Sequence, residues 1–189
     1  MRVVALSIVF AFPLFLHSQV HHELKFDVLG AVTQHPRLSY EYSAGKNWGL
    51  EIAFGYLDDD IDLSDYNSTG AYLSYAIDRT FFTVDLTGKY YFLSQQRAAG
   101  AFIGLFARNE TKLSQADGYE EAYQTIYGHQ PTQKLVDESF LLGGVIGYKL
   151  IVYKRWVIQG QLALARDLNT GLDIPVTEAD LFLTIGYRW

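Results

Sequence analysis

Five aspartates in one short stretch are the residues best suited to bind a metal ion: Asp58, Asp59, Asp60, Asp62 and Asp65. Three of them alternate along the chain, as the oxygen ligands of calcium loops do. The rest of such a loop is missing, because no glycine stands at its sixth place and Thr69 takes the place of the final glutamate. A solvated acidic loop explains the charges equally well. We expect no metal ion and no cofactor here, and a calcium site is the alternative.

The histidines form no recognisable catalytic motif. Acyl-transfer chemistry needs a nucleophile, a base and an orienting group close together. No histidine beyond the first segment lies beside a serine in a nucleophile motif; these histidines are His21, His22, His35 and His129. We therefore expect no catalytic residues and no enzyme. A lipid-modifying enzyme is the alternative, because a triad is defined by geometry and not by sequence position.

A second polar segment, at 111 to 137, mixes acidic and aromatic residues. Loops carried by a rigid scaffold are where binding usually occurs. The segment is therefore either a contact surface for a protein partner or a polar loop without one. The residues that would make the contact are Asp117, Tyr119, Glu120, Glu121, Tyr123, Tyr127 and His129.

Composition narrows the class of protein. The net charge of -6 argues against nucleic acid as a partner, because phosphate backbones are bound by basic patches. The chain has 14 Tyr, 12 Phe and 16 Gly, and only 19% of its residues are charged, which favours strands over helices. It has no cysteine, so disulfides and thiolate metal sites are excluded.

The first residues have the layout of an export signal. Arg2 precedes an apolar run at 3 to 16, and polar residues follow at 17 to 19. The run is shorter than the roughly 20 apolar residues that a membrane-spanning helix needs. We expect residues 1–19 to be a cleaved signal peptide and residues 20–189 to form one outer-membrane β-barrel domain.

Period-two alternation runs through the rest of the chain and predicts antiparallel strands. Most stretches have about the 9 to 11 residues that a tilted strand needs to cross a bilayer. Short and long connectors alternate, with a short tip at 34–36 as the exception. Further alternation at 69 to 78 leaves open a longer fourth strand or a separate one, and hence ten strands. The eight predicted strands cover 24–33, 37–44, 48–57, 80–92, 100–110, 138–149, 156–166 and 179–189.

Large aromatic residues on one parity of these strands lie beside the short connectors. Such rings mark the headgroup level of a membrane-spanning barrel, so this parity is expected to face lipid. One predicted ring comprises Tyr42, Trp48, Tyr90, Phe92, Tyr148, Trp156, Tyr187 and Trp189, and a thinner ring at the other end comprises Tyr56, Phe82 and Phe140.

The opposite parity carries positive and negative charges in near balance. Unpaired buried ions are costly, and an eight-stranded barrel is only just wide enough for its own side chains, so we expect an interior plugged by salt bridges. A narrow channel is one alternative. A soluble periplasmic lipid-binding barrel, with the parity reversed, is another. The predicted inward charges are Lys25, Arg37, Lys89, Arg108, Lys149 and Arg188 against Asp27, Glu41, Glu51, Asp85 and Asp180.

The segment PRLSYEYSAGKNWGLEIAFGY and the terminal GYRW make the chain similar to small outer-membrane barrels of the OmpA and OmpX type, above all to an uncharacterised outer-membrane β-barrel family of Bacteroidota. Tyr187 and Trp189 resemble the signal that the barrel-assembly machinery binds, with Thr184 where glycine is usual. The resemblance implies an all-β, eight-stranded antiparallel up-and-down transmembrane barrel with short periplasmic turns and longer extracellular loops. It also implies a bacterial outer-membrane location, contact with lipid and lipopolysaccharide, and a structural or binding role.

Overall fold

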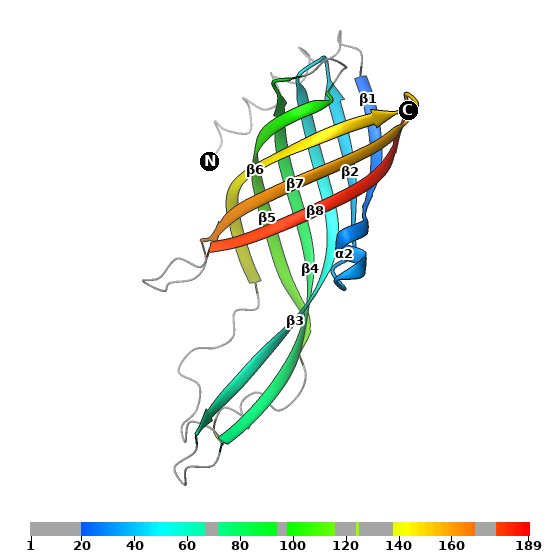
Figure 1. The fold of residues 1–189 in the computed structure, drawn as a ribbon. Coiled ribbons are helices and arrows are strands. Elements are labelled where there is room, and N and C mark those ends of the chain that lie inside the picture. Colours follow the sequence, from blue (N-terminus) through cyan, green and yellow to red (C-terminus); the bar gives the residue numbers. More distant parts are fainter. Residues whose placement is uncertain (1–19, 67–71, 94–97, 116–123, 125–137, 169–176) are drawn as a thin grey trace.

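The molecule is a closed barrel of eight antiparallel strands (Figure 1). Each strand pairs with the next one in the sequence, and β1 pairs with β8 to close the barrel. The computed structural model describes residues 20–66, 72–93, 98–115, 124, 138–168 and 177–189. The predicted fold class is confirmed. The strands are β1 (Val20–Asp27), β2 (Arg37–Ala44), β3 (Trp48–Tyr66), β4 (Tyr72–Tyr91), β5 (Gly100–Gln115), β6 (Glu138–Val152), β7 (Trp156–Asp167) and β8 (Thr177–Arg188).

The side chains of each strand alternate between the inside and the outside of the barrel. On β7, Val157, Gln159 and Gln161 are buried, while Ile158 and Leu162 between and beyond them are exposed. Period two is the geometry of any strand, because successive side chains leave opposite faces of the pleat. The interior of the barrel is therefore the core, and the outer surface holds the large exposed apolar residues.

The first strand differs from its prediction at both ends. It begins at Val20 and stops at Asp27, and a short helix, α2 (Val28–Val32), takes the place of the predicted strand end and lengthens the tip at 34–36. The Asp27 carboxylate accepts a hydrogen bond from the Leu183 backbone N–H at 3.2 Å, where a continuing strand would have supplied a carbonyl. Within the part of the chain that the structure describes, no helix has the length and apolar character needed to span a membrane.

The prediction of a long loop at 58 to 79 is wrong, because most of these residues belong to strands. Strands β3 and β4 stay paired as far as Tyr66 and Tyr72, and Figure 1 shows this hairpin extending well beyond the barrel wall. The alternation at 69 to 78 therefore belongs largely to a longer fourth strand. The barrel closes with eight strands, so the ten-stranded alternative is wrong.

The end of the barrel with the short turns is covered by its own chain. The backbone N–H of Ala98 donates to the carbonyl of Lys46 at 2.8 Å, and that of Tyr91 donates to the carbonyl of Asn47 at 2.7 Å. Ala98 and Ala99 are both buried. Ala98, just before β5, thus lies against the turn between β2 and β3 at this end of the barrel.

Candidate functional site in the barrel interior

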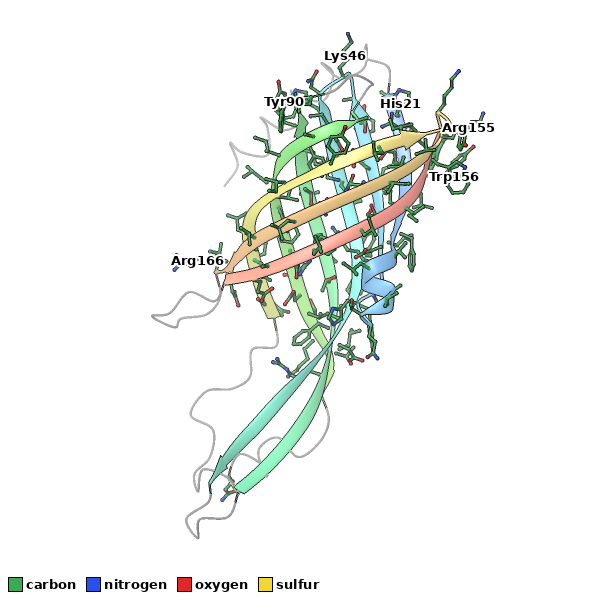
Figure 2. The ribbon with its side chains drawn as sticks, in the orientation of Figure 1. His21, Lys46, Tyr90, Arg155, Trp156 and Arg166 are labelled. Atoms are coloured by element: carbon green, nitrogen blue, oxygen red, sulfur yellow. The ribbon has the colours of Figure 1, made fainter. Side chains whose placement is uncertain are left out.

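The outer face of the barrel has the predicted parity. Apart from Tyr42, which is half-buried, every residue of the two predicted aromatic rings is exposed. Rings on neighbouring strands touch at the short-turn end, with centroids 5.0 Å apart for Trp48 and Tyr90 and 5.9 Å apart for Trp156 and Tyr187. In Figure 2, Tyr90 and Trp156 lie at this end and Arg166 at the other. A soluble lipid-binding barrel needs the reverse parity, so that alternative is wrong.

Glu41 of β2 is the centre of a buried charge cluster in the lumen. No part of this side chain is exposed to solvent. Three lysines from three other strands and one phenol surround its carboxylate. The carboxylate accepts hydrogen bonds from Lys25 at 2.6 Å, Lys89 at 2.9 Å, Lys149 at 2.5 Å and the Tyr91 hydroxyl at 2.7 Å.

A second carboxylate, Glu51 of β3, shares two of these lysines. Its oxygens accept from Lys89 at 2.6 Å and from Lys25. The amide oxygen of Gln159 accepts from the same two ammonium groups, at 3.1 Å from Lys25 and 3.3 Å from Lys89. Each of the two ammonium groups therefore has several oxygen partners, which is the condition under which a buried charge is tolerated.

Residues from all eight strands meet in this part of the lumen. Lys149 of β6 also binds Glu23 of β1 at 2.9 Å, and Glu23 binds Arg188 of β8. The Phe102 ring of β5 lies 5.1 Å from the Lys89 ammonium group. We call this group the inner cluster: Glu23, Lys25, Glu41, Glu51, Lys89, Tyr91, Phe102, Lys149, Gln159 and Arg188.

A second group of charges lies nearer the long-loop end, and we call it the loop-side cluster: Arg37, Asp85, Arg108, Glu110 and Asp180. The Arg108 guanidinium donates to Asp85 and to Asp180, both at 2.8 Å. Arg37 Nε lies 2.8 Å from the other Asp85 oxygen. The Asp180 side chain is 33% exposed, so water reaches this cluster as it does not reach the inner one.

All eleven charges predicted to point inward do so, and ten of them form ion pairs in one of the two clusters. Asp27 is the exception, because it binds the Leu183 backbone. Sequence reasoning missed Glu23 and Glu110, and it missed Tyr91. Each has the parity of a predicted inward charge two residues away on its strand, so the alternation itself contained the signal.

The backbone of the aspartate stretch is a strand and not the predicted loop. The Asp58 carboxylate accepts a hydrogen bond from the Thr80 hydroxyl at 3.0 Å. Residues 58 to 65 belong to β3, and an extended backbone lacks the sharp turn that wraps a calcium loop around its ion. The side chains of Asp59, Asp60, Asp62 and Asp65 lie outside the described residues. Among the side chains that are described, no group of three His, Asp or Glu is placed to hold a metal ion.

Three histidines lie in the described part of the chain: His35 is exposed, and His21 and His22 are half-buried at the start of β1. The ring Nδ1 of His22 is 2.5 Å from the Tyr40 hydroxyl, and His35 Nε2 is 2.9 Å from the Asp58 carbonyl oxygen. His21 lies at the short-turn end (Figure 2). His129, the contact residues predicted in the second long loop and the predicted signal peptide at 1–19 lie outside the described residues.

Solved structures share the fold. The outer membrane protein OprG from Pseudomonas aeruginosa matches with a TM-score of 0.53 and 13% identity, over 91% of this chain and 96% of that chain. Yersinia pestis Ail matches with a TM-score of 0.45 and 10% identity, over 92% of this chain and 100% of that one. Outer Membrane Protein W of E. coli has a TM-score of 0.45 and 12% identity, over 91% and 98%. No curated protein matches the sequence.

These observations agree on location and on family. A closed barrel with an apolar outside, aromatic rings at its ends and the fold of OprG is a transmembrane barrel of the bacterial outer membrane. The family model described as "Protein of unknown function (DUF3575)" matches residues 4–165. The chain therefore belongs to the DUF3575 family.

Proposed function

We propose that the protein is a structural and binding component of the outer membrane whose lumen is plugged by the inner cluster. The observation that carries this proposal is the buried contact of Glu41 with lysines from β1, β4 and β6. In the strand order β6 lies opposite β2, so the contact of Lys149 with Glu41 crosses the lumen, and the other two lysines reach the same carboxylate from β1 and β4. The interior of an eight-stranded barrel is only about as wide as its side chains, and this cluster occupies that width.

The covering of the short-turn end supports the same proposal. Arg188 of the inner cluster donates from Nη2 to the Ala98 carbonyl at 3.2 Å. Ala98 is fully buried and is itself bonded to the turn between β2 and β3. A solute would have to displace both this segment and the charges beneath it. A barrel of this kind acts through its surfaces, and the narrow channel predicted as an alternative becomes the second choice.

Binding, and not catalysis, is the role we infer for those surfaces. Support comes from His22 and His35 among the described residues: His22 is hydrogen-bonded to the Tyr40 hydroxyl and His35 to the Asp58 backbone carbonyl, so neither of these bonds is to a serine. The long-loop end, where the β3–β4 hairpin projects, would face the cell exterior and meet a protein partner. The outer face would contact lipid and lipopolysaccharide.

We also propose how the protein is exported and inserted into the outer membrane. Export would use the segment at 1–19 as a cleaved signal peptide, and Tyr187 and Trp189 would be bound by the barrel-assembly machinery. Both aromatic side chains are accessible at the end of β8. A source among Bacteroidota stays a prediction from the resemblance.

Heat-modifiable gel migration tests the proposed location. Washed outer membranes and the soluble periplasmic fraction are compared, each with and without boiling. We expect the protein in the outer membranes, with a mobility that changes on boiling, because a closed barrel resists detergent until it is heated. Recovery in the soluble fraction with unchanged mobility would contradict the proposal.

A further inference from the structure

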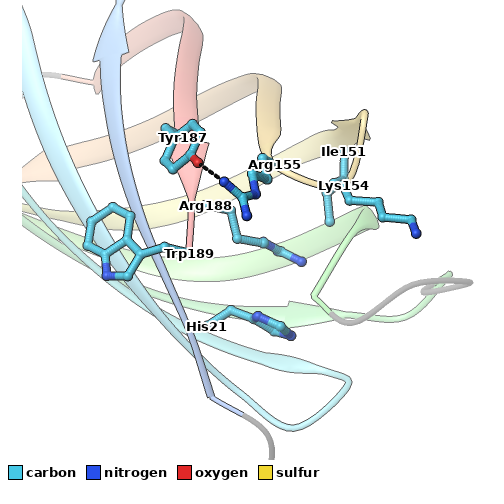
Figure 3. Close-up of a pocket in the computed structure, with 7 residues that line it drawn as sticks. All are labelled: His21, Ile151, Lys154, Arg155, Tyr187, Arg188 and Trp189. Atoms are coloured by element: carbon cyan, nitrogen blue, oxygen red, sulfur yellow. Dashed lines mark hydrogen bonds between the residues drawn. The ribbon is translucent and has the colours of Figure 1, made fainter.

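A basic pocket of about 540 Å³ opens at the short-turn end, between the β6–β7 turn and the end of β8 (Figure 3). The function proposed above concerns the lumen and the loop surfaces, and it gives this pocket no role. Four of its residues carry basic side chains, and two are aromatic. They are His21, Lys154, Arg155 and Arg188, with Tyr187 and Trp189.

Among the residues that the structure describes, no Asp or Glu side chain lines this pocket. Arg188 is engaged by Glu23 inside the barrel, so its charge is already compensated. Lys154 and Arg155 line the pocket from the turn, where both are exposed, and neither forms an ion pair with a carboxylate of the described residues. The Trp189 backbone is held to the edge of β1 by two hydrogen bonds with the His22 backbone.

The Arg155 guanidinium is held in place. Its Nη1 donates to the Tyr187 hydroxyl at 2.7 Å, as the dashed line in Figure 3 shows. Four further N–H donors of the guanidinium are then available in a planar fork, which is the geometry that matches the oxygens of a phosphate group. Lys154 adds a second, more mobile positive charge.

The turn that carries these residues has an unfavourable backbone for them. Arg155 N–H donates to the Val152 carbonyl at 3.3 Å, and Tyr153 and Lys154 between them have φ of 51° and 66°. Such a type I′ turn favours Asn-Gly, because residues with a Cβ are disfavoured at positive φ. Tyr153 and Lys154 therefore hold a tight, strained turn at the edge of the pocket.

The pocket lies at the height of the aromatic ring. Trp156, which follows the turn directly, packs edge-on against Tyr187, which lines the pocket. Aromatic rings of this kind lie at the level of lipid headgroups. The two exposed cations are therefore placed where lipid phosphates are found.

We propose that this pocket binds the phosphate of an anionic phospholipid headgroup in the adjacent leaflet, an inference that rests on the proposed membrane location. Arg155 would bind two phosphate oxygens, and Lys154 would provide a second charge. Ile151 and Trp189 at the rim would contact the glycerol and the first methylenes of the lipid.

Native mass spectrometry of the barrel purified in a neutral detergent tests this proposal. The protein is titrated with phosphatidylglycerol, and in parallel with phosphatidylcholine, which carries no net charge. We expect one phosphatidylglycerol to bind in preference. The double variant Lys154→Gln and Arg155→Gln should bind it roughly tenfold or more weakly, because each basic residue near a lipid headgroup contributes substantially.

The matched control is the double variant Lys46→Gln and Arg166→Gln, which removes two positive charges away from the pocket and should bind as the unchanged protein does. Equal binding of both lipids, or equal affinity of the pocket variant, would overturn the proposal. Displacement of the lipid by an equimolar amount of inorganic phosphate would overturn the assignment to a lipid. Heat-modifiable migration of each variant shows separately whether the membrane barrel has formed.

Discussion

The inner and outer faces of the barrel wall follow different rules, although they alternate along the same strands. On β2, Glu41 is fully buried and has charged partners on three other strands, whereas its neighbour Tyr40 is 36% exposed. On β5, Phe106 is buried beside Leu105, which is 75% exposed. The inner face depends on particular partners. The outer face depends only on apolar character, because lipid adapts to any apolar shape.

Loss of the central carboxylate should have the largest effect. Glu41→Gln leaves three buried ammonium groups with too few negative partners, and removal of one member of a buried ion pair costs about 3–5 kcal/mol. Urea unfolding of the protein in detergent micelles measures the change. Tyr42→Phe, one residue away on the outer face, should change the stability by about 0.5 kcal/mol or less. Similar small effects at both positions would show that the inner cluster is not what stabilises the barrel.

A charge placed on the outer face is the next largest effect. Leu183 lies on the lipid side of β8, between the two aromatic rings, and Leu183→Arg should cost about 2–4 kcal/mol near the bilayer midplane. Leu113 is also exposed, but it lies near the far end of β5, and Leu113→Arg should cost about 0–1 kcal/mol outside the hydrocarbon. Reconstitution into lipid vesicles followed by unfolding gives both values. Equal costs would remove the basis for the assigned lipid face.

Two glycines show that the inner and outer faces differ in the space they leave for an added methyl group. A Cβ on Gly143, on the inward parity of β6, would lie 1.9 Å from the Leu164 carbonyl oxygen, whereas a Cβ on Gly88, on the outer face of β4, has nothing within 4 Å. Gly143→Ala should therefore destabilise the barrel by about 1–3 kcal/mol through overpacking. Gly88→Ala should have little effect. The same urea titration reports both, and a cost at Gly88 that matches the cost at Gly143 would refute the difference.

The smallest loss of stability is expected for a charge removed from the loop-side cluster, which water reaches. Asp180→Asn removes a charge that is one-third exposed, and Arg108 keeps its bond to Asp85. We expect a loss of about 1 kcal/mol or less, since water screens such a pair. A loss comparable to that of Glu41→Gln would mean that the two clusters are equally dry.

Most of the fold could be predicted from the alternation of apolar and polar residues along the chain. A strand with lipid on one side and packed charges on the other must have this alternation. That rule placed Trp48 and Tyr90 outside and Lys25 and Asp85 inside. It failed at 28 to 32, where the short apolar run VLGAV suits a strand and a helix equally. The pairing of β1 with β8 ends there, where the Leu183 backbone N–H donates to the Asp27 carboxylate. These two residues are more than 150 positions apart in the sequence, so the contact could not be predicted from the local pattern.

The partners inside the lumen could not be predicted from the sequence. Lys149 and Glu41 are 108 residues apart, and their contact depends on the stagger of eight strands around the barrel. Charge balance indicates that pairs exist, but it does not say which residues form them. The acidic residues at 58 to 65 led to a wrong loop prediction, because composition alone does not show that the backbone there pairs with β4.

Single-channel recording tests the plugged lumen most directly. Purified barrel, shown to be folded by its heat-modifiable migration, is added to a planar lipid bilayer under an applied voltage. The buried contacts of Glu41 with three lysines, one of them Lys149 on the opposite side of the lumen, predict no steady conductance. Discrete, reproducible channels from the folded protein would contradict the central claim and make ion conduction the function to pursue.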